Sequence, residues 1–319
     1  MKLKPLGGTG LRVSPIGYGL AAVGRPAYIN VGHGGDLGPN RSVEALRARA
    51  GELLDAAYEA GVRYFDAARS YGRAEEFLAG WLGRRGLEPG AVAVGSKWGY
   101  TYTGGWRVDA ERHEVKDLSA DTLRRQLGET RGVLGAHLGL YQIHSATLES
   151  GVLEDREVMD ELGALRAEGV AVGATLTGPR QGETAERVLE TGAFDAIQAT
   201  WNLLERSAGP ALARAHEAGI GIIVKEVLAN GRLVGDRASD PLASAARQLG
   251  AAPDAVALAA ALAQPWADVV LSGAATVAQL ESNLAAADLH YGPDLDARLT
   301  ALVEDAESYW DRRASLPWA

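Results

Sequence analysis

Short apolar segments alternate with longer amphipathic segments along most of the chain. The short segments are typical of buried parallel strands, and the longer ones carry apolar residues at helical spacing and often end at a glycine. The pattern predicts strands at 16–20, 62–67, 91–97, 138–144, 170–176, 195–201, 220–227 and 268–273, and helices at 43–60, 74–85, 119–134, 155–168, 183–191, 207–218, 240–249, 254–264, 276–288 and 294–308.

Eight consecutive strand–helix units in 319 residues predict an α/β fold of the closed (β/α)8 TIM barrel type. The turn sequence Gly7-Gly8-Thr9-Gly10 between two apolar runs predicts an N-terminal β-hairpin. Segments 24–42 and 99–117 are expected to be long βα loops. A doubly wound sheet is the alternative, but no strand is followed by a G-x-G-x-x-G sequence. No linker separates two halves, so residues 1–319 are expected to form a single barrel domain.

The composition narrows the class of protein. A net charge of −9 argues against nucleic acid or an anionic membrane as the main partner. The absence of cysteine excludes disulfides and thiol catalysis. No secretory signal and no apolar run of about 20 residues is evident. A cytoplasmic protein that binds a small molecule is expected, with a homo-oligomer left open.

Four residues with complementary chemistry lie at or just after predicted strand ends. Asp66 ends the second strand, Lys97 the third and His144 the fourth, while Tyr71 lies in the loop after the second. In a barrel, all strands direct their carboxyl ends to one rim, where catalytic residues gather. The Lys97 ammonium, held by Asp66, would lower the pKa of Tyr71 and let its phenol exchange a proton. His144 could donate a hydrogen bond to a carbonyl oxygen. Such a group suits hydride transfer, which requires a cofactor.

These residues belong to sequences that resemble the aldo-keto reductase superfamily. FDAARSYGRAE, GSKWG and YQIH occur in the family's order and at comparable spacing. VGATL, QATWNLLE, VLANGRLVG and VLSGAATVAQLESNLAA are similar to its later segments, and GGTGLRVSPIGYGLA is similar to its opening hairpin. The resemblance implies a barrel with Tyr71 as general acid/base, a nicotinamide cofactor, and a carbonyl, alcohol or sugar substrate.

The resemblance also implies where the cofactor is held. Thr175 and Gln198 would hold the nicotinamide carboxamide, and the helix after Thr276 would offer free amides to a phosphate. Lys225 stands where many relatives have an aromatic residue and could reach a cofactor phosphate or an acid, with Lys225 and the adjacent Glu226 pointing to opposite sides. The full predicted set is Thr175, Gln198, Asn202, Lys225, Ser272, Gly273, Gln279 and Asn283.

The cofactor preference is less clearly indicated. Gly273, Ala275 and Gln279 are uncharged where relatives that prefer NADP place Arg or Lys beside the 2′-phosphate. NADP(H) is expected because the family leans that way, with Arg232 or Arg247 as candidate replacements, and NAD(H) is the alternative.

The two long loops carry further candidates. Trp98, Tyr100, Tyr102 and Trp106 are predicted either to wall a substrate pocket or to pack on one another. Segment 109–117 is interpreted as a lid. The loop residues His33 and His113 are expected to be exposed to solvent, with contact to the substrate as the alternative. The final helix is expected to lead into an aromatic tail containing Tyr309, Trp310 and Trp318, of which the two tryptophans could add to the pocket wall. No metal site is expected, since no two histidines lie three or four positions apart.

Three functions remain open from the sequence. The leading hypothesis is an NAD(P)(H)-dependent oxidoreductase that transfers a hydride between nicotinamide and a carbonyl or alcohol. The second is an NAD-preferring aldose dehydrogenase, which the uncharged positions 273, 275 and 279 favour. The third is a cofactor-binding regulatory module with little turnover, against which the complete set of four residues argues.

Overall fold

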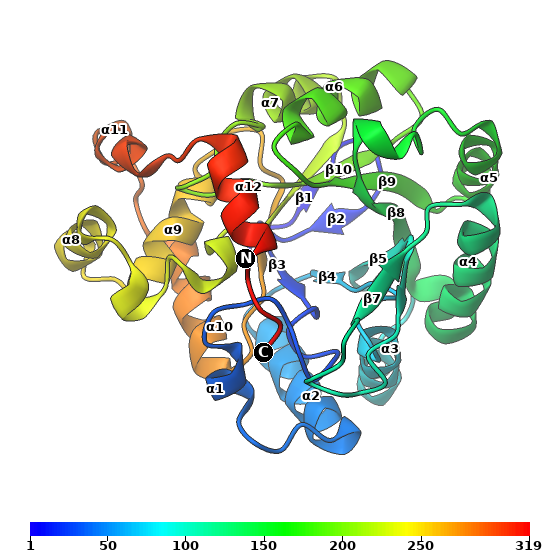
Figure 1. Cartoon of the computed structure of the whole chain (residues 1–319), viewed down its shortest axis with the longest axis horizontal. Coiled ribbons are helices and arrows are strands. Elements are labelled where there is room, and N and C mark those ends of the chain that lie inside the picture. The colour runs from blue at the N-terminus through cyan, green and yellow to red at the C-terminus, as the bar shows by residue number, and fades with distance from the viewer.

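The computed structural model describes residues 1–319 and contains a closed barrel of eight parallel strands (Figure 1). β12 closes the barrel on β3, with Val270 opposite Ile16. The predicted (β/α)8 barrel is therefore confirmed, and a doubly wound sheet is excluded because the strands form a ring with no free edge. The barrel strands are β3 (Ile16–Gly19), β4 (Tyr64–Asp66), β5 (Ala93–Trp98), β8 (Leu138–Ala146), β9 (Ala171–Leu176), β10 (Ala196–Thr200), β11 (Gly221–Lys225) and β12 (Val269–Ser272).

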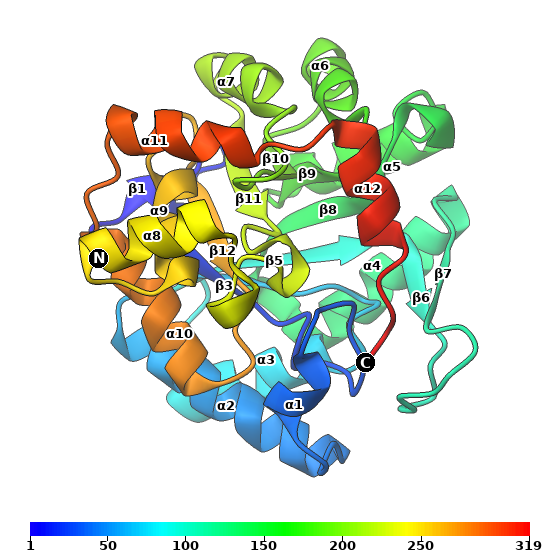
Figure 2. The same ribbon diagram turned by 60° about the vertical axis from the view of Figure 1, so that its left-hand side comes forward.

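Helices surround the strands on the outside of the barrel (Figures 1 and 2). Their starts follow ordinary capping chemistry: Ser42 accepts a hydrogen bond from the Ala45 amide, and Ser119 accepts one from the Thr122 amide. The helices are α2 (Val43–Glu59), α3 (Ala74–Arg85), α4 (Ala120–Leu134), α5 (Arg156–Ala167), α6 (Gln181–Thr191), α7 (Gly209–Glu217), α8 (Asp240–Leu249), α9 (Pro253–Leu262) and α10 (Val277–Leu284), with short 3-10 turns at Gly135–His137, Leu148–Ser150, Ala229–Gly231, Gly235–Arg237, Ala285–Asp288 and Thr300–Leu302.

The predicted N-terminal hairpin is present and closes one end of the barrel. Its strands β1 (Lys4–Pro5) and β2 (Arg12–Val13) pair antiparallel. Leu6 lies between them and is fully buried, and the Gly8 amide donates to the Gly219 carbonyl at 2.9 Å. Leu6 and Val13 form a small apolar cluster with residues of seven barrel strands: Tyr64, Ala93, Leu140, Ala171, Ala196, Ile223 and Val269. The hairpin is therefore the plug of the amino-terminal end of the barrel.

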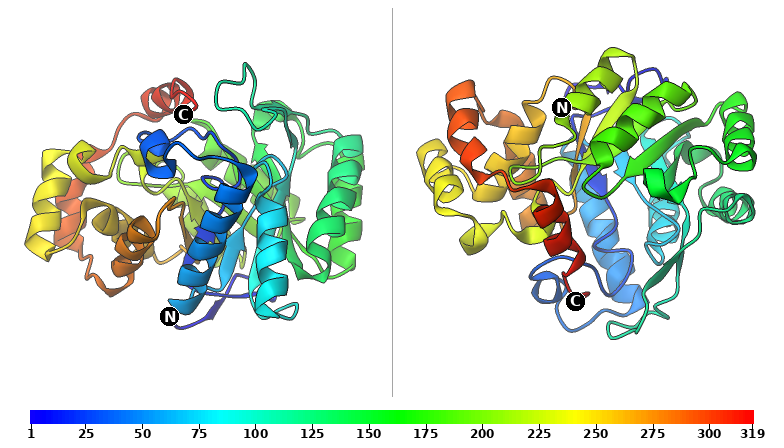
Figure 3. Two further views of the ribbon diagram at one scale, coloured as in Figure 1. Left: turned by 90° about the horizontal axis from the view of Figure 1, so that it is seen from below. Right: turned by 45° about the horizontal axis from the view of Figure 1, so that its top comes forward.

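The prediction of one helix over 294–308 is wrong. α11 (Pro293–Leu299) ends early, and a separate helix α12 (Ala306–Ala314) begins at Asp305, whose carboxylate accepts from the Ser308 amide. Tyr309 and Trp310 lie within α12 and are buried, so they are not part of a tail. Figures 1 and 3 show α12 crossing the opposite end of the barrel from the hairpin.

The two long loops are more ordered than their sequences suggest. Segment 24–42 contains α1 (His33–Leu37), and segment 99–117 forms a hairpin of β6 (Tyr100–Tyr102) and β7 (Glu114–Lys116).

The expected exposure of the two loop histidines is wrong, since both are buried. The His33 ring packs edge-on at 5.9 Å from Tyr28, and the His113 ring stacks at 4.4 Å on Trp318. The C-terminal tail causes part of this burial, because residues 28 and 319 exchange two backbone hydrogen bonds of 3.1 and 3.2 Å.

No helix is both long and apolar enough to cross a lipid bilayer.

The hairpin plug generates a stability prediction. Leu6→Ala should lower the free energy of unfolding by about 2–5 kcal/mol, because it opens a cavity in a buried cluster. Guanidinium denaturation followed by circular dichroism measures the effect. Lys2→Ala is the matched control, since Lys2 is exposed on the same segment and its truncation should cost within about 0.5 kcal/mol. Equal midpoints for the two variants would contradict the plug.

Candidate active site

A cavity opens at the carboxyl ends of the barrel strands, beneath α12 and the β6–β7 hairpin. With its open mouth included, the space between its walls is about 1480 Å³. Strand ends supply much of its lining: Gly19 from β3, Asp66 from β4, His144 from β8, Gln198 from β10, Lys225 from β11 and Ser272 from β12.

A buried ion pair lies directly beneath this cavity. The Lys97 side chain is 1% exposed, and its ammonium contacts the Asp66 carboxylate and donates to the Ala67 carbonyl at 2.9 Å. The second carboxylate oxygen of Asp66 accepts from the Tyr64 hydroxyl at 3.2 Å and from the Gln198 amide at 3.0 Å. A buried charge is tolerated when it is paired and its remaining lone pairs are satisfied. Asp66 meets both conditions, so its position is fixed.

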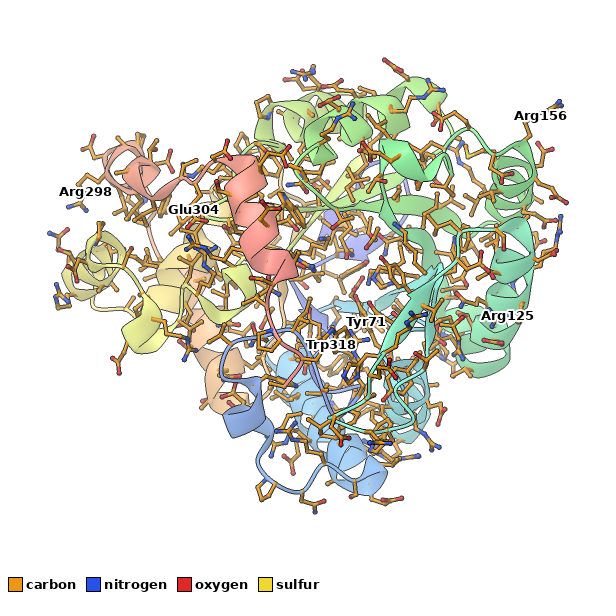
Figure 4. The ribbon with its side chains drawn as sticks, viewed as in Figure 1. Tyr71, Arg125, Arg156, Arg298, Glu304 and Trp318 are labelled. Carbon is orange, nitrogen blue, oxygen red and sulfur yellow. The ribbon has the colours of Figure 1, made fainter.

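Tyr71 lies over this ion pair at the cavity wall. Lys97 Nζ is 5.0 Å from the centre of the Tyr71 ring. The backbone of Tyr71 is held by a close approach to Gly24, where an added Cβ would lie 2.3 Å from the Tyr71 carbonyl oxygen. Figure 4 shows Tyr71 over the middle of the barrel. The prediction that Asp66, Lys97 and Tyr71 gather at one rim therefore agrees with the observed geometry.

The net pKa of Tyr71 is raised, whereas the sequence argument expected it to be lowered. Removal from water raises the pKa of Tyr71 well above its ordinary value, and the Asp66 carboxylate raises it further. The positive charge of Arg25 lowers the pKa of Tyr71, and the sequence argument did not consider this residue. Tyr71 is therefore a phenol near neutral pH, the form that can give a proton.

His144 faces Tyr71 across the cavity. Their rings meet edge to face at 5.5 Å, and Tyr100 packs against the other side of the imidazole at 4.9 Å. Burial lowers the pKa of His144 well below its ordinary value, and cationic neighbours led by Lys97 and Arg25 lower it further. The imidazole is thus neutral, with one N–H to donate. Its Nδ1 is buried without a partner, as expected of a group that serves a ligand.

Four predicted cofactor residues gather at the far end of the cavity: Ser272, Gly273, Gln279 and Asn283. The Ser272 hydroxyl donates to Asn283 Oδ1 at 2.7 Å, and the Asn283 amide donates to Asp254 at 2.8 Å. Gln279 Oε1 accepts from the Ala275 amide at 2.9 Å. The set offers small side chains, amides and the start of α10, which suits the phosphate and ribose groups of a dinucleotide.

Two predicted cofactor residues do not line the cavity. The Thr175 hydroxyl accepts from the Ser145 amide at 2.8 Å, and the Asn202 amide donates to the Glu226 carbonyl at 3.0 Å and the Tyr309 hydroxyl at 2.9 Å. Ser145 and Glu226 do line it. Both have positive φ, 61° and 55°, which is costly for residues other than glycine and is often found at functional sites. Thr175 and Asn202 therefore hold the backbone of lining residues in strained conformations.

Lys225 lines the cavity as predicted, but so does Glu226, and the expectation that the two point to opposite sides is wrong. The left-handed backbone of Glu226 breaks the alternation of the strand. Burial lowers the pKa of Lys225 to about 8, and its ammonium donates to the Thr200 hydroxyl at 2.8 Å. Burial raises the pKa of Glu226, but Arg313 of α12 and Lys225 together bring it down to about 2. The Arg313–Glu226 pair joins α12 to the rim.

Only one of the four loop aromatic residues reaches the cavity. Tyr100 lines it, whereas Trp98 is buried in the barrel core. The Tyr102 hydroxyl accepts from the Trp106 backbone amide at 3.1 Å, so Tyr102 packs within the loop. The Trp106 ring instead packs against Phe77 of α3, and its indole Nε1 donates to the Arg41 carbonyl at 2.8 Å, so for Trp106 neither alternative is correct.

The other side of the cavity is lined by Arg25, Tyr28, Glu114 and Trp318. Sequence reasoning missed the charged pair on this side: Arg25 and Glu114 lie 89 positions apart and form a salt bridge of 2.7 Å. No local pattern marks Arg25 as a site residue, and the only signal for Glu114 was its place in segment 109–117, which was interpreted as a lid.

The position of His144 generates a pH prediction. Its imidazole should stay neutral as pH falls from 7 to 5, because burial and neighbouring cations oppose protonation. The unfolded chain takes up that proton below pH ~6.5, so this group should lower stability as pH falls through that range. Nitrogen-15 spectra of the imidazoles, with His144→Gln to assign the signal, measure its protonation. An imidazolium signal from His144 at pH 6 would contradict this electrostatic environment.

Comparison with known proteins shows to which family this chain is similar. The model of the Aldo/keto reductase family matches residues 15–304. The uncharacterized oxidoreductase YqkF of Bacillus subtilis (strain 168) is 25% identical over 313 residues, covering 90% of this chain and 92% of the relative. A solved structure from Pseudomonas aeruginosa, provisionally named an aldo-keto reductase, is 28% identical with a TM-score of 0.65, covering 90% of this chain and 94% of the other.

A second solved structure supports the fold. The aldo-keto reductase AKR11C1 from Bacillus halodurans, in its holo form, has a TM-score of 0.74 at 20% identity and covers 96% of this chain and 97% of its own. Because the family model spans nearly the whole barrel, the chain belongs to the aldo/keto reductase family of nicotinamide-dependent oxidoreductases.

Proposed function

We propose that this protein interconverts a carbonyl compound and the corresponding alcohol with NADP(H), using Tyr71 as general acid and base. The observation that carries this proposal is that a phenol and a neutral imidazole face each other across one cavity. A carbonyl oxygen placed between them meets two hydrogen-bond donors as negative charge develops on it.

The nicotinamide cofactor, when bound, supplies the hydride to the carbonyl carbon or accepts it from the alcohol carbon. In reduction, His144 orients the carbonyl oxygen and Tyr71 transfers its proton to that oxygen, so that one hydride and one proton convert the carbonyl into the alcohol. In oxidation, Tyr71 takes the proton back. The raised pKa of Tyr71 keeps the phenol protonated for reduction.

Lys97 and Asp66 support Tyr71 without contacting the substrate. When Tyr71 has given up its proton, its phenolate faces Lys97 Nζ, 5.0 Å from the ring centre, and the Arg25 guanidinium, 5.3 Å from it. Both cations stabilise the phenolate, which limits the cost of the proton transfer. Asp66 keeps Lys97 in place.

The predicted cofactor residues retain their proposed roles where they line the cavity. Gln198 would contact the carboxamide. Lys225, whose only acidic partner is Glu226 at the long distance of 3.9 Å, would contact a phosphate. Ser272, Gly273, Gln279 and Asn283 would take the adenosine end. Thr175 and Asn202 would act indirectly, through Ser145 and Glu226.

Two arginines support the choice of NADP(H). Arg49 donates to the Ala275 carbonyl at 3.2 Å and forms no salt bridge, and Arg237 lines the cavity and also forms none. Either can supply the charge that positions 273, 275 and 279 lack. The two earlier candidates fit less well. Arg232 is paired with Glu304, and Arg247, which like Arg49 does not line the cavity, makes no hydrogen bond to residues 273–279.

An NAD-preferring aldose dehydrogenase is the second candidate function. Asp254 lines the adenosine end, where its carboxylate would accept a hydrogen bond from a ribose 2′-hydroxyl and would repel a 2′-phosphate.

The acid–base role of Tyr71 predicts a kinetic result. Tyr71→Phe should lower kcat about 10²–10⁴-fold for a panel of aldehydes, because it removes only the proton donor. Tyr58→Phe is the matched control, since Tyr58 lies on α2 and its hydroxyl makes no hydrogen bond. Turnover by the wild type no faster than by Tyr71→Phe would favour a regulatory module instead.

The cofactor proposal predicts tighter binding of NADPH than of NADH. Loss of a charge-assisted contact costs roughly 1.5–3 kcal/mol, so Kd should differ by about 10- to 100-fold. Fluorescence titration measures both constants. Arg49→Gln and Arg237→Gln should weaken NADPH more than NADH, and Arg298→Gln on α11 is a remote control. Tighter binding of NADH by the wild type would select the aldose dehydrogenase alternative.

A further inference from the structure

Arg25 is a buried cation in the part of the cavity that the four proposed catalytic residues leave unexplained. It follows β3 and is only 2% exposed. Its Nη1 donates to the Ser70 carbonyl at 2.9 Å and to the Glu114 carboxylate at 2.7 Å. These contacts join three separate segments: the loop after β3, the loop that carries Tyr71, and the β6–β7 hairpin.

Three aromatic rings fix the orientation of this guanidinium. Its central carbon lies 4.6 Å from the centre of a Trp318 ring, 5.3 Å from Tyr71 and 5.5 Å from Tyr28. Figure 4 shows Trp318 beside Tyr71 over the middle of the barrel. A planar cation packed between aromatic rings loses little further freedom when it binds a ligand, so it is preorganised for recognition.

Half of the guanidinium lacks a partner. Nη1 makes every hydrogen bond of the side chain, and Nε is buried without one. A buried donor without an acceptor is costly, and Arg25 lines the cavity in which a substrate would lie. The edge formed by Nε and Nη2 has the spacing that matches the two oxygens of a carboxylate.

Every acid near the reacting groups already has a cationic partner. Lys97 contacts Asp66, Arg25 contacts Glu114, and Arg313 contacts Glu226. The charges that lower the pKa of His144 most are four cations: Lys97, Arg25, Lys225 and Lys116. A substrate carboxylate beside Arg25 would therefore meet no unpaired acid among these groups.

We propose that Arg25 binds a carboxylate of the substrate, so that the natural substrate is an oxo acid: an aldehyde or ketone that also carries a carboxylate. This proposal rests on the proposed function. Glu114 competes for the same cation, and it therefore sets how strongly the acid is preferred over a neutral carbonyl compound. Trp318, from the C-terminal tail, covers the guanidinium and completes the subsite.

The experiment compares acids with amides of nearly the same shape. The substrate pairs are succinic semialdehyde with 4-oxobutanamide, and 4-carboxybenzaldehyde with 4-formylbenzamide. The measured quantity is the ratio of kcat/KM for acid over amide. For at least one pair the wild type should show a ratio of about 10 or more, and Arg25→Gln should lower it about 10- to 100-fold, mainly through KM, because a charge-assisted contact is lost.

Two further variants separate recognition of charge from loss of structure. Glu114→Gln should raise the ratio, since it frees Arg25 from a competing carboxylate, whereas damage to the pocket would lower kcat/KM for both members of a pair. Arg25→Lys should keep part of the ratio, because it keeps the charge but not the planar edge. Arg156→Gln is the matched control: Arg156 lies on the outer rim of the molecule (Figure 4) and makes no salt bridge, so the ratio should not change.

A binding measurement keeps this proposal separate from the proposed function. Calorimetric titration of the protein with 4-carboxybenzaldehyde, without cofactor, should show binding that Arg25→Gln weakens about 10-fold or more. Such binding without turnover of any aldehyde would refute the catalytic function and leave the carboxylate site intact. Turnover with a ratio near 1 for both pairs, or with a ratio that Arg25→Gln leaves unchanged, would overturn the carboxylate site and leave the function intact.

Discussion

The buried ion pair between Asp66 and Lys97 is the constraint on which the site depends. Two charges are removed from water inside the barrel, and such a pair is stable only if its geometry is good and its remaining polar groups are satisfied. β4 and β5 provide that geometry, because Asp66 and Gly95 are partners in adjacent strands and Lys97 follows two residues later. The Tyr64 hydroxyl and the Gln198 amide donate hydrogen bonds to the other oxygen of the Asp66 carboxylate. Tyr71 rests on this fixed base, and no loop motion is needed to bring its phenol near a cation.

The mouth of the cavity depends on contacts between segments far apart in the chain. Arg313 of α12 pairs with Glu226, and Arg25 pairs with Glu114 of the β6–β7 hairpin. The tail is tied by backbone hydrogen bonds between residues 28 and 319, and these bring Trp318 over Arg25. Barrel strands therefore supply Asp66, Lys97 and His144, and the loop after β4 supplies Tyr71, while the C-terminal segment and the long loops shape what can bind beside them.

The sequence predicted the barrel and the core of the site because both follow from local patterns. Apolar runs separated by amphipathic helices indicated eight strand–helix units, and barrel geometry then placed the polar residues at strand ends on one rim. Asp66, Tyr71 and His144 line one cavity, and Lys97 lies beneath it. Their roles in proton transfer stay predictions. The cofactor positions were also expected at the right end of the barrel, apart from Thr175 and Asn202, which lie behind the cavity wall.

What the sequence by itself determined is the set of groups that each strand carries to the rim, since the period of apolar residues decides where each strand ends. Only the tertiary structure decided which distant residues meet there. The pairing of Arg25 with Glu114 spans 89 positions, and Trp318 covers that pair because the tail returns to residue 28. The left-handed backbone of Glu226 directs the adjacent side chains of Lys225 and Glu226 into the same cavity. Contacts of this kind form only when the whole chain folds, so the local periodicity of apolar residues does not predict them.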